Sequence, residues 1–211
     1  MNKIVIYILI LITALFAYSC VELENTVSFN KDGSGTILLK YRISKMILDN
    51  SDLDIPLPLT TKEFRFAVEN QPGIIIKQIV QEENETDMII TAEFDFASIE
   101  TLLSVYELSS MQFSLTRDSA SMPDSKNEYT FKQIIFEGTG QDAEEINPET
   151  MQMLKSFFEG YNLNFTVITP EPVEFNNIGE KINDNTVSFS IPTLELSNAE
   201  EEMVFIVKWL Q

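Results

Sequence analysis

Apolar and polar residues alternate in several stretches of the chain, and the first of these stretches come in pairs. Val21–Asn30 and Thr36–Ile43 flank the segment KDGSG, which has the composition of a turn. Alternation with a period of two is typical of a β-strand, and an Asp-Gly turn between two such runs predicts a β-hairpin. Two further pairs of runs predict two more hairpins: Ile74–Val80 with Met88–Phe96, and Met111–Arg117 with Glu128–Phe136.

Three other segments place apolar residues three or four positions apart, which is the spacing of one helix face. The first follows Thr60, with Glu63 three residues later, in the pattern of a capping box. The second follows Ser98, and the third follows Asn147-Pro148, a capping residue with a proline at the first turn. The predicted buried stripes are Phe64, Ala67 and Val68; Ile99, Leu102, Leu103 and Tyr106; and Met151, Leu154, Phe157 and Phe158.

The C-terminal part of the chain returns to strand-like runs, which are Leu163–Ile168, Val173–Phe175, Val187–Ile191 and Met203–Trp209. The predicted order is hairpin and helix, three times over, and then a strand-rich end. Hairpins pair antiparallel strands, and a helix with one apolar stripe covers a sheet face. We therefore expect an α+β fold. Its sheet is curved, mainly antiparallel and built from successive hairpins, with about three short amphipathic helices packed on one face.

The first 20 residues have a different pattern. Lys3 is followed by apolar residues from Ile4 to Phe16, broken only by Thr13, and then by Ala17-Tyr18-Ser19-Cys20. A charged start, an apolar core of about 7–15 residues and a small-residue end describe a secretory signal peptide. The run is shorter than the roughly 20 residues of a transmembrane helix. We expect residues 1–19 to be a signal peptide and residues 20–211 to be a single domain.

Cys20 is the only cysteine of the chain, and its position predicts lipidation. The preceding residues resemble a relaxed lipobox, whose usual form is Leu-(Ala/Ser)-(Gly/Ala)-Cys. Processing of such a signal makes the acylated cysteine the new N-terminus, and more than one acyl chain gives stable membrane anchoring. The alternatives are an uncleaved anchor or an ordinary signal peptide with a chance cysteine. We favour a lipoprotein that is exported to the bacterial cell envelope, on its periplasmic or surface face.

Charge narrows the set of partners. The chain has 33 acidic and 14 basic residues, for a net charge of −19, and removal of residues 1–19 makes it one unit more negative. Such a surface repels nucleic-acid phosphates and anionic headgroups. We expect no nucleic acid as a partner. Membrane association must then use the acyl chains on Cys20 rather than a basic face.

The residue types also argue against an enzyme. The chain has no histidine, which removes His-based metal sites and Ser-His-Asp or Cys-His nucleophiles. Neighbouring carboxylates such as Glu93 and Asp95 could in principle act as acid and base. With 33 acids, however, such pairs arise by chance, and Glu93 and Asp95 fit the wet face of a strand. We expect no catalytic residue, cofactor or metal.

One loop imitates a calcium site. Asn30, Asp32, Ser34 and Gly35 follow the first half of an EF-hand loop, but the twelfth position is Tyr41 instead of the required glutamate. The flanking segments are predicted strands rather than helices. A tight hairpin turn explains the same residues, and we reject the calcium site.

Two stretches carry a resemblance to a known family. They are CVELENTVSFNKDGSGTILLKYRIS, a cysteine followed by a strand and a hairpin, and FTVITPEPVEFNNIGEKINDNTVSFSIP, a run of strands and proline or asparagine turns. With the strand and helix order between them, they resemble the LppM-domain family of bacterial lipoproteins over most of residues 20–211. The resemblance implies an exported, anchored α+β domain similar to lipid-binding folds. It implies no ligand-binding residues.

These observations predict a non-enzymatic, lipid-anchored envelope lipoprotein that binds a lipid or another apolar ligand between its helices and sheet. The Met- and Phe-rich predicted helix at residues 147–160 offers soft apolar surface for such a ligand, although the same side chains could simply cover the sheet. The alternative function is a protein–protein interaction or assembly module of the cell envelope. An apolar cavity would favour the lipid, and a solid core with exposed apolar residues would favour the protein partner.

Overall fold

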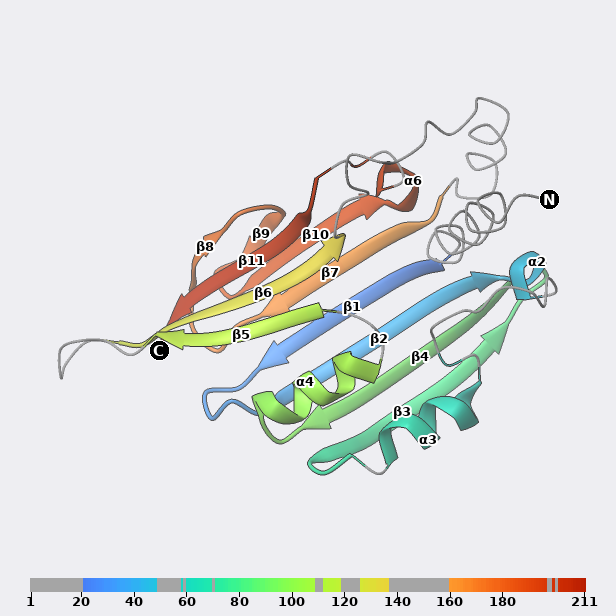
Figure 1. Cartoon of the computed structure of the whole chain (residues 1–211), viewed down its shortest axis with the longest axis horizontal. Helices are drawn as coiled ribbons and strands as arrows, with labels where there is room; N and C mark the ends of the chain where they lie inside the picture. Colours follow the sequence, from blue (N-terminus) through green and yellow to red (C-terminus); the bar gives the residue numbers. More distant parts are fainter. Residues whose placement is uncertain are drawn as a thin grey trace, which may run out of the picture.

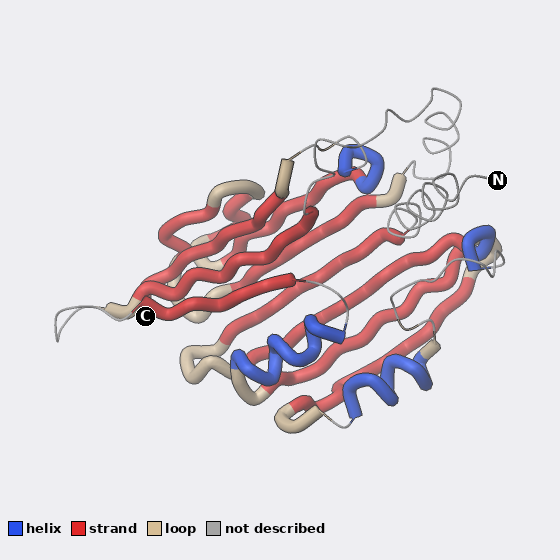
Figure 2. Tube along the Cα trace, in the orientation of Figure 1, coloured by secondary structure: helices blue, strands red, loops and turns tan. Residues whose placement is uncertain are grey.

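The computed structural model describes residues 21–48, 58, 60–69, 71–108, 112–118, 126–136, 160–196, 199 and 201–211. The predicted signal peptide, Cys20 and the helix predicted after Asn147 lie outside the described residues. The described part consists mainly of strands, joined by short helices and turns (Figures 1 and 2).

Seven of the described strands form the larger sheet: β1 (Val21–Phe29), β2 (Gly35–Ser44), β3 (Ile74–Glu83), β4 (Asp87–Phe96), β7 (Asn162–Ile168), β9 (Glu180–Asn183) and β10 (Thr186–Pro192). Their order across the sheet is β3-β4-β2-β1-β7-β10-β9, so that β1 is the central strand. The pairing of β1 with β7 is parallel, and the other strand pairs of this sheet are antiparallel.

The smaller sheet contains β5 (Gln112–Asp118), β6 (Glu128–Phe136), β8 (Val173–Asn176) and β11 (Met203–Leu210). These strands lie in the order β5-β6-β11-β8, and all of their pairings are antiparallel. The described helices are α2 (Lys45–Leu48), α3 (Thr61–Glu69), α4 (Ile99–Leu108) and α6 (Thr193–Leu196).

The α+β class and the three predicted hairpins are confirmed, as β1-β2, β3-β4 and β5-β6. Both predicted caps in the described part are formed. The amide of Glu63 donates to Thr60 Oγ1 at 3.1 Å, and the amide of Thr101 donates to Ser98 Oγ at 3.3 Å. These bonds satisfy amide groups that a helix start leaves without intrahelical partners.

The structure contains the short helices α2 and α6, which were not predicted, and it also differs from the prediction in its sheets. The strands divide between two sheets rather than one, and the segment NNIGEKINDN, between two of the predicted strands, contains the extra strand β9. All four residues of β9 are exposed, so the strand has no buried face and no alternating pattern to reveal it.

One face of the larger sheet is covered along its width by two kinds of element. Helices α3 and α4 lie over the part formed by β2, β4 and β3, and the smaller sheet lies over the part that contains β1, β7 and β10 (Figure 1). The alternation of burial along β2, and along β4 from Met88 onward, follows from this one-sided cover. Helices therefore pack on one face, as predicted, but they share that face with the second sheet.

The short helix α3 provides a test of this packing. Phe64 is 5% exposed and points to the sheet, whereas Phe66, two residues later, is 77% exposed. We expect Phe64→Ala to lower the free energy of unfolding by about 3–5 kcal/mol, because it removes a buried ring and leaves a cavity. Phe66→Ala on the same helix should change it by less than about 0.5 kcal/mol.

Urea unfolding followed by the fluorescence of Trp209 measures both values. Trp209 is the only tryptophan of the chain and lies 2% exposed on β11. Equal effects of the two substitutions would show that α3 does not pack on the sheet as described.

Candidate functional site

The sequence predicts an apolar ligand between the helices and the sheet, and the space under helix α3 is one such place. Aromatic rings occupy it in the structure. Phe64 stacks on Phe94 of β4 with ring centroids 5.5 Å apart and on Tyr41 of β2 at 6.3 Å. The Tyr41 hydroxyl donates a hydrogen bond to the carbonyl of Pro58, and burial raises its pKa above the ordinary range. A ligand at this point would have to displace core side chains.

The interface between the two sheets is filled in the same way. Trp209 stacks on Phe29 and on Tyr129, with 5.5 Å between centroids in each pair. Phe131 and Phe205, also from the smaller sheet, are 0% exposed. The candidate sites therefore lie on the surface of the domain.

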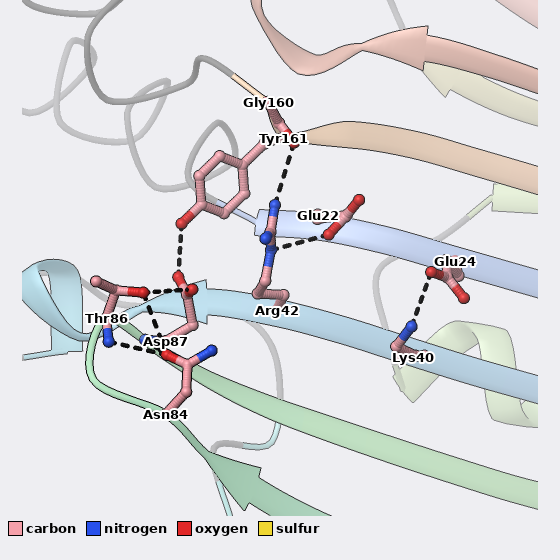
Figure 3. A network of polar contacts seen from close by, with 9 residues as sticks. All are labelled: Glu22, Glu24, Lys40, Arg42, Asn84, Thr86, Asp87, Gly160 and Tyr161. Atoms are coloured by element: carbon pink, nitrogen blue, oxygen red, sulfur yellow. Dashed lines mark hydrogen bonds and ion pairs between the residues drawn. The ribbon is translucent and has the colours of Figure 1, made fainter.

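The first surface candidate is a polar cluster at one end of the larger sheet, beside the start of β1 (Figure 3). Arg42 of β2 forms an ion pair with Glu22 of β1, with 2.9 Å between Nε and Oε2. The same guanidinium donates to the carbonyl of Gly160 at 3.1 Å and lies 4.4 Å from the ring centroid of Tyr161. The Tyr161 hydroxyl in turn donates to Asp87 Oδ1 at 2.7 Å.

Asp87 begins β4 and is 6% exposed, so its charge needs partners. Besides Tyr161, Thr86 Oγ1 donates to its other carboxylate oxygen at 2.8 Å. Burial by itself would raise the pKa of Asp87. The hydrogen bonds from Tyr161 and Thr86 and the charge of Arg42 outweigh burial and hold the pKa below its ordinary value of 3.8.

The pKa of Tyr161 is shifted in the opposite direction, upward. Burial, together with the hydrogen bond to Asp87 and its negative charge, raises the pKa of Tyr161 to about 12. The phenol therefore stays protonated at neutral pH and acts as a donor. Arg42 and Glu22 form an ion pair, and the Asp87 carboxylate accepts hydrogen bonds from Tyr161 and Thr86. The cluster therefore joins the ends of β1, β2, β4 and the segment before β7.

The second surface candidate is an open depression of about 610 Å³ beside the start of β11. Its volume lies within the usual range of ligand pockets, about 300–1,000 Å³. The lining combines four apolar residues with two acids and one amide: Ile178, Ala199, Met203, Val204, Glu201, Glu202 and Asn177.

Asn177, one of the residues that line the depression, is hydrogen-bonded to β11. Its side chain donates to the carbonyl of Val204 at 2.7 Å and accepts from the amide of Ile206 at 2.7 Å. These bonds hold the loop between β8 and β9 against β11. The depression is therefore bordered by a fixed loop, with exposed glutamates at its rim.

The predicted site residue, Cys20, lies outside the described residues, and so does the predicted Met- and Phe-rich helix. Glu93 and Asp95 both form ion pairs with Lys77, at 3.4 and 2.8 Å, as expected for the wet face of a strand. The KDGSG loop forms the predicted turn. In it, Asp32 Oδ1 accepts hydrogen bonds from the amide and hydroxyl of Ser34, at 3.0 and 2.6 Å.

Among the described residues, no group of three or more Cys, Asp or Glu is placed to hold a metal ion. Within the same ranges, no helix has both the length and the apolar character needed to span a bilayer. Sequence reasoning missed the Arg42, Tyr161 and Asp87 cluster, because these residues are far apart in the chain and no local motif connects them.

Comparison with known proteins supports the fold. No family model matches the chain, and no curated protein matches it. Among solved structures, the chain is similar to the NMR structure of the folded domain of LppM from Mycobacterium tuberculosis, with a TM-score of 0.53 and 10% sequence identity. The match covers 90% of each chain. The resemblance to LppM seen in the sequence is therefore confirmed at the level of the fold.

The polar cluster generates a prediction about pH. Because the pKa of Asp87 is lower in the folded than in the unfolded chain, its stabilising effect is present above about pH 4 and is lost as the pH falls through the folded value. We expect Asp87→Asn to reduce the free energy of unfolding by about 1–3 kcal/mol at pH 7. The difference from wild type should shrink toward pH 3.

Urea unfolding between pH 3 and pH 7 measures this difference. Tyr161→Phe, which removes one hydroxyl donor and leaves the carboxylate, should cost less than Asp87→Asn. A constant difference at every pH would show that the Asp87 charge has no role in stability.

Proposed function

We propose that the protein is a lipid-anchored lipoprotein of the bacterial cell envelope, without enzymatic activity, whose domain binds the apolar part of a ligand. Two observations support the anchor: the signal-like segment that ends at Cys20, and a fold similar to that of the LppM domain. The lack of histidine and the paired state of the charges in the Arg42 cluster support a binding role over a catalytic one.

The depression beside β11 is the observation that carries the binding proposal. Aromatic rings fill the space under α3, whereas the depression exposes Ile178, Met203 and Val204 to an open volume of about 610 Å³. An acyl chain is the first candidate ligand. Because Glu201 and Glu202 lie at the rim, a neutral, zwitterionic or cationic headgroup fits better than an anionic one.

A protein partner is the second candidate occupant of this region. Phe175 of β8 is 48% exposed and Ile182 of β9 is 60% exposed, on the two strands that flank the loop with Asn177. Exposed apolar residues beside a depression are typical of interaction surfaces. In that case an apolar side chain of the partner fills the depression.

The anchor predicts a simple change in membrane association. In the full-length chain, Cys20→Ser removes the only thiol. We expect the variant to incorporate no labelled palmitate and to leave the membrane fraction, whereas the wild-type chain is labelled and stays with membranes. Palmitate labelling and fractionation at high salt measure these two properties. Label in the Cys20→Ser variant would contradict the proposed anchor.

Ligand binding is tested on the chain without residues 1–20 by native mass spectrometry, with lipid extraction. We expect a stoichiometric lipid that is released on denaturation. Met203→Gln, which keeps the side-chain length but adds a polar amide to the depression, should weaken lipid binding about tenfold, because part of the apolar contact is lost.

Ile182→Gln is the matched control, because Ile182 is exposed on the neighbouring strand and does not line the depression. It should leave lipid binding unchanged. A native mass spectrum that shows only the lipid-free protein, even after fatty acids and phospholipids are added, would exclude the lipid as the ligand. It would favour the protein partner.

A further inference from the structure

The start of β1 places a restriction on how an anchored domain can be oriented. Val21, the residue directly after Cys20, is already paired with Ile43 of β2. Strand β1 is also the central strand of the larger sheet, bonded to β2 on one side and to β7 on the other. No linker residue separates the cysteine from the folded sheet.

Several strand ends gather at this point of the molecule. Val21 begins β1, Ser44 ends β2 opposite Asp87 of β4, and β7 begins at Asn162, parallel to β1. The helix α2 and the turn between β3 and β4 lie at the same end, on the right of Figure 1. We name these elements the anchor end.

The anchor end is held together by the polar cluster of Figure 3. Arg42 connects β2 with Glu22 of β1 and with the carbonyl of Gly160, and Tyr161 connects the segment before β7 with Asp87 of β4. Thr86 and Asn84 extend these bonds into the turn between β3 and β4. The amide of Lys45 at the start of α2 donates to the carbonyl of Thr86 at 2.7 Å. These contacts join the turn, α2 and the start of β1.

From this geometry, and resting on the proposed lipidation of Cys20, we infer that the anchor end is a docking surface for the bilayer, with the strands pointing away from the membrane. Glu22 is two residues from Cys20, which corresponds to about 7 Å along a strand. The interfacial layer of a bilayer is about 5–7 Å thick on each side. Glu22, Arg42 and Tyr161 therefore lie at the level of the lipid headgroups.

The charges of the anchor end fit a zwitterionic surface. Arg42 pairs with Glu22, and Lys45 pairs with Glu83 at 3.2 Å. Pairing reduces the local repulsion of an otherwise acidic chain, and a tyrosine is favoured at the membrane–water boundary. Exposed Glu85 in the turn adds a negative charge, which disfavours anionic lipid.

The opposite end of β1 is far from the membrane in this orientation. The nine residues of β1 span about 30 Å, so the turn that contains Lys31 lies about that distance from the headgroups. A domain that follows its lipid anchor directly thus has one end that contacts the membrane and one end that is remote from it. A domain on a flexible linker has no fixed orientation, and therefore neither a contacting end nor a remote end.

The experiment uses the full-length lipoprotein, purified from membranes and placed in phosphatidylcholine vesicles that carry a nitroxide on their headgroups. Acylation blocks Cys20, so a second cysteine is the only reactive thiol. Glu85→Cys labels the anchor end and Lys31→Cys labels the remote end, both at exposed turn positions. We expect several-fold stronger quenching of a fluorophore at position 85 than at position 31.

A second variant separates tethering from docking. Ten Gly/Ser residues inserted between Cys20 and Val21 should reduce the difference in quenching between the two labels, because the domain can then turn freely. Equal quenching at positions 85 and 31 without the insertion would overturn the docking surface and leave the anchor in place. A chain that does not bind vesicles and whose position 20 accepts the fluorophore would overturn both the anchor and the docking surface.

Discussion

The burial of one face of the larger sheet depends on Phe29, at the junction between the two kinds of cover. Its ring lies 5.9 Å from Phe96 on the side of the helices, and 6.0 and 5.5 Å from Phe131 and Trp209 of the smaller sheet. Edge and stacked contacts of this kind add to the energy of apolar burial. Phe29 thus connects the core under α3 and α4 with the core between the two sheets, and the two form one continuous cluster.

The other face of the larger sheet has a different, mainly polar composition. Apart from Leu38, its residues on β1 and β2 are polar, and some form cross-strand ion pairs, such as Lys40 with Glu24 at 2.9 Å. Exposed pairs of this type contribute little to stability, but they place unlike charges opposite one another in a chain of net charge −19. At the anchor end the Arg42–Glu22 pair lies beside the hydrogen bonds of buried Asp87, and together these contacts connect four segments of the fold.

Local patterns were sufficient to predict the hairpins and the capped helices, because each depends on residues close in sequence. Thr60 and Glu63, for example, determine the start of α3 by themselves. The division into two sheets and the parallel neighbour of β1 depend on contacts between distant strands, which one sequence does not reveal. The same holds for the polar cluster: Tyr161 and Asp87 are 74 positions apart. The prediction of lipidation at Cys20 also depends on a local pattern, the signal-like segment before it, and it stays a prediction.

The parallel pair β1–β7 also determines the order in which the domain can be completed. Leu23 pairs with Leu163, 140 positions later in the chain. During synthesis β1 can pair at once with β2, but its second edge stays open until β7 is available. Closing so long a loop costs entropy and slows folding, and an open strand edge invites pairing with other chains. An incomplete chain therefore exposes the strand that becomes the centre of the finished sheet.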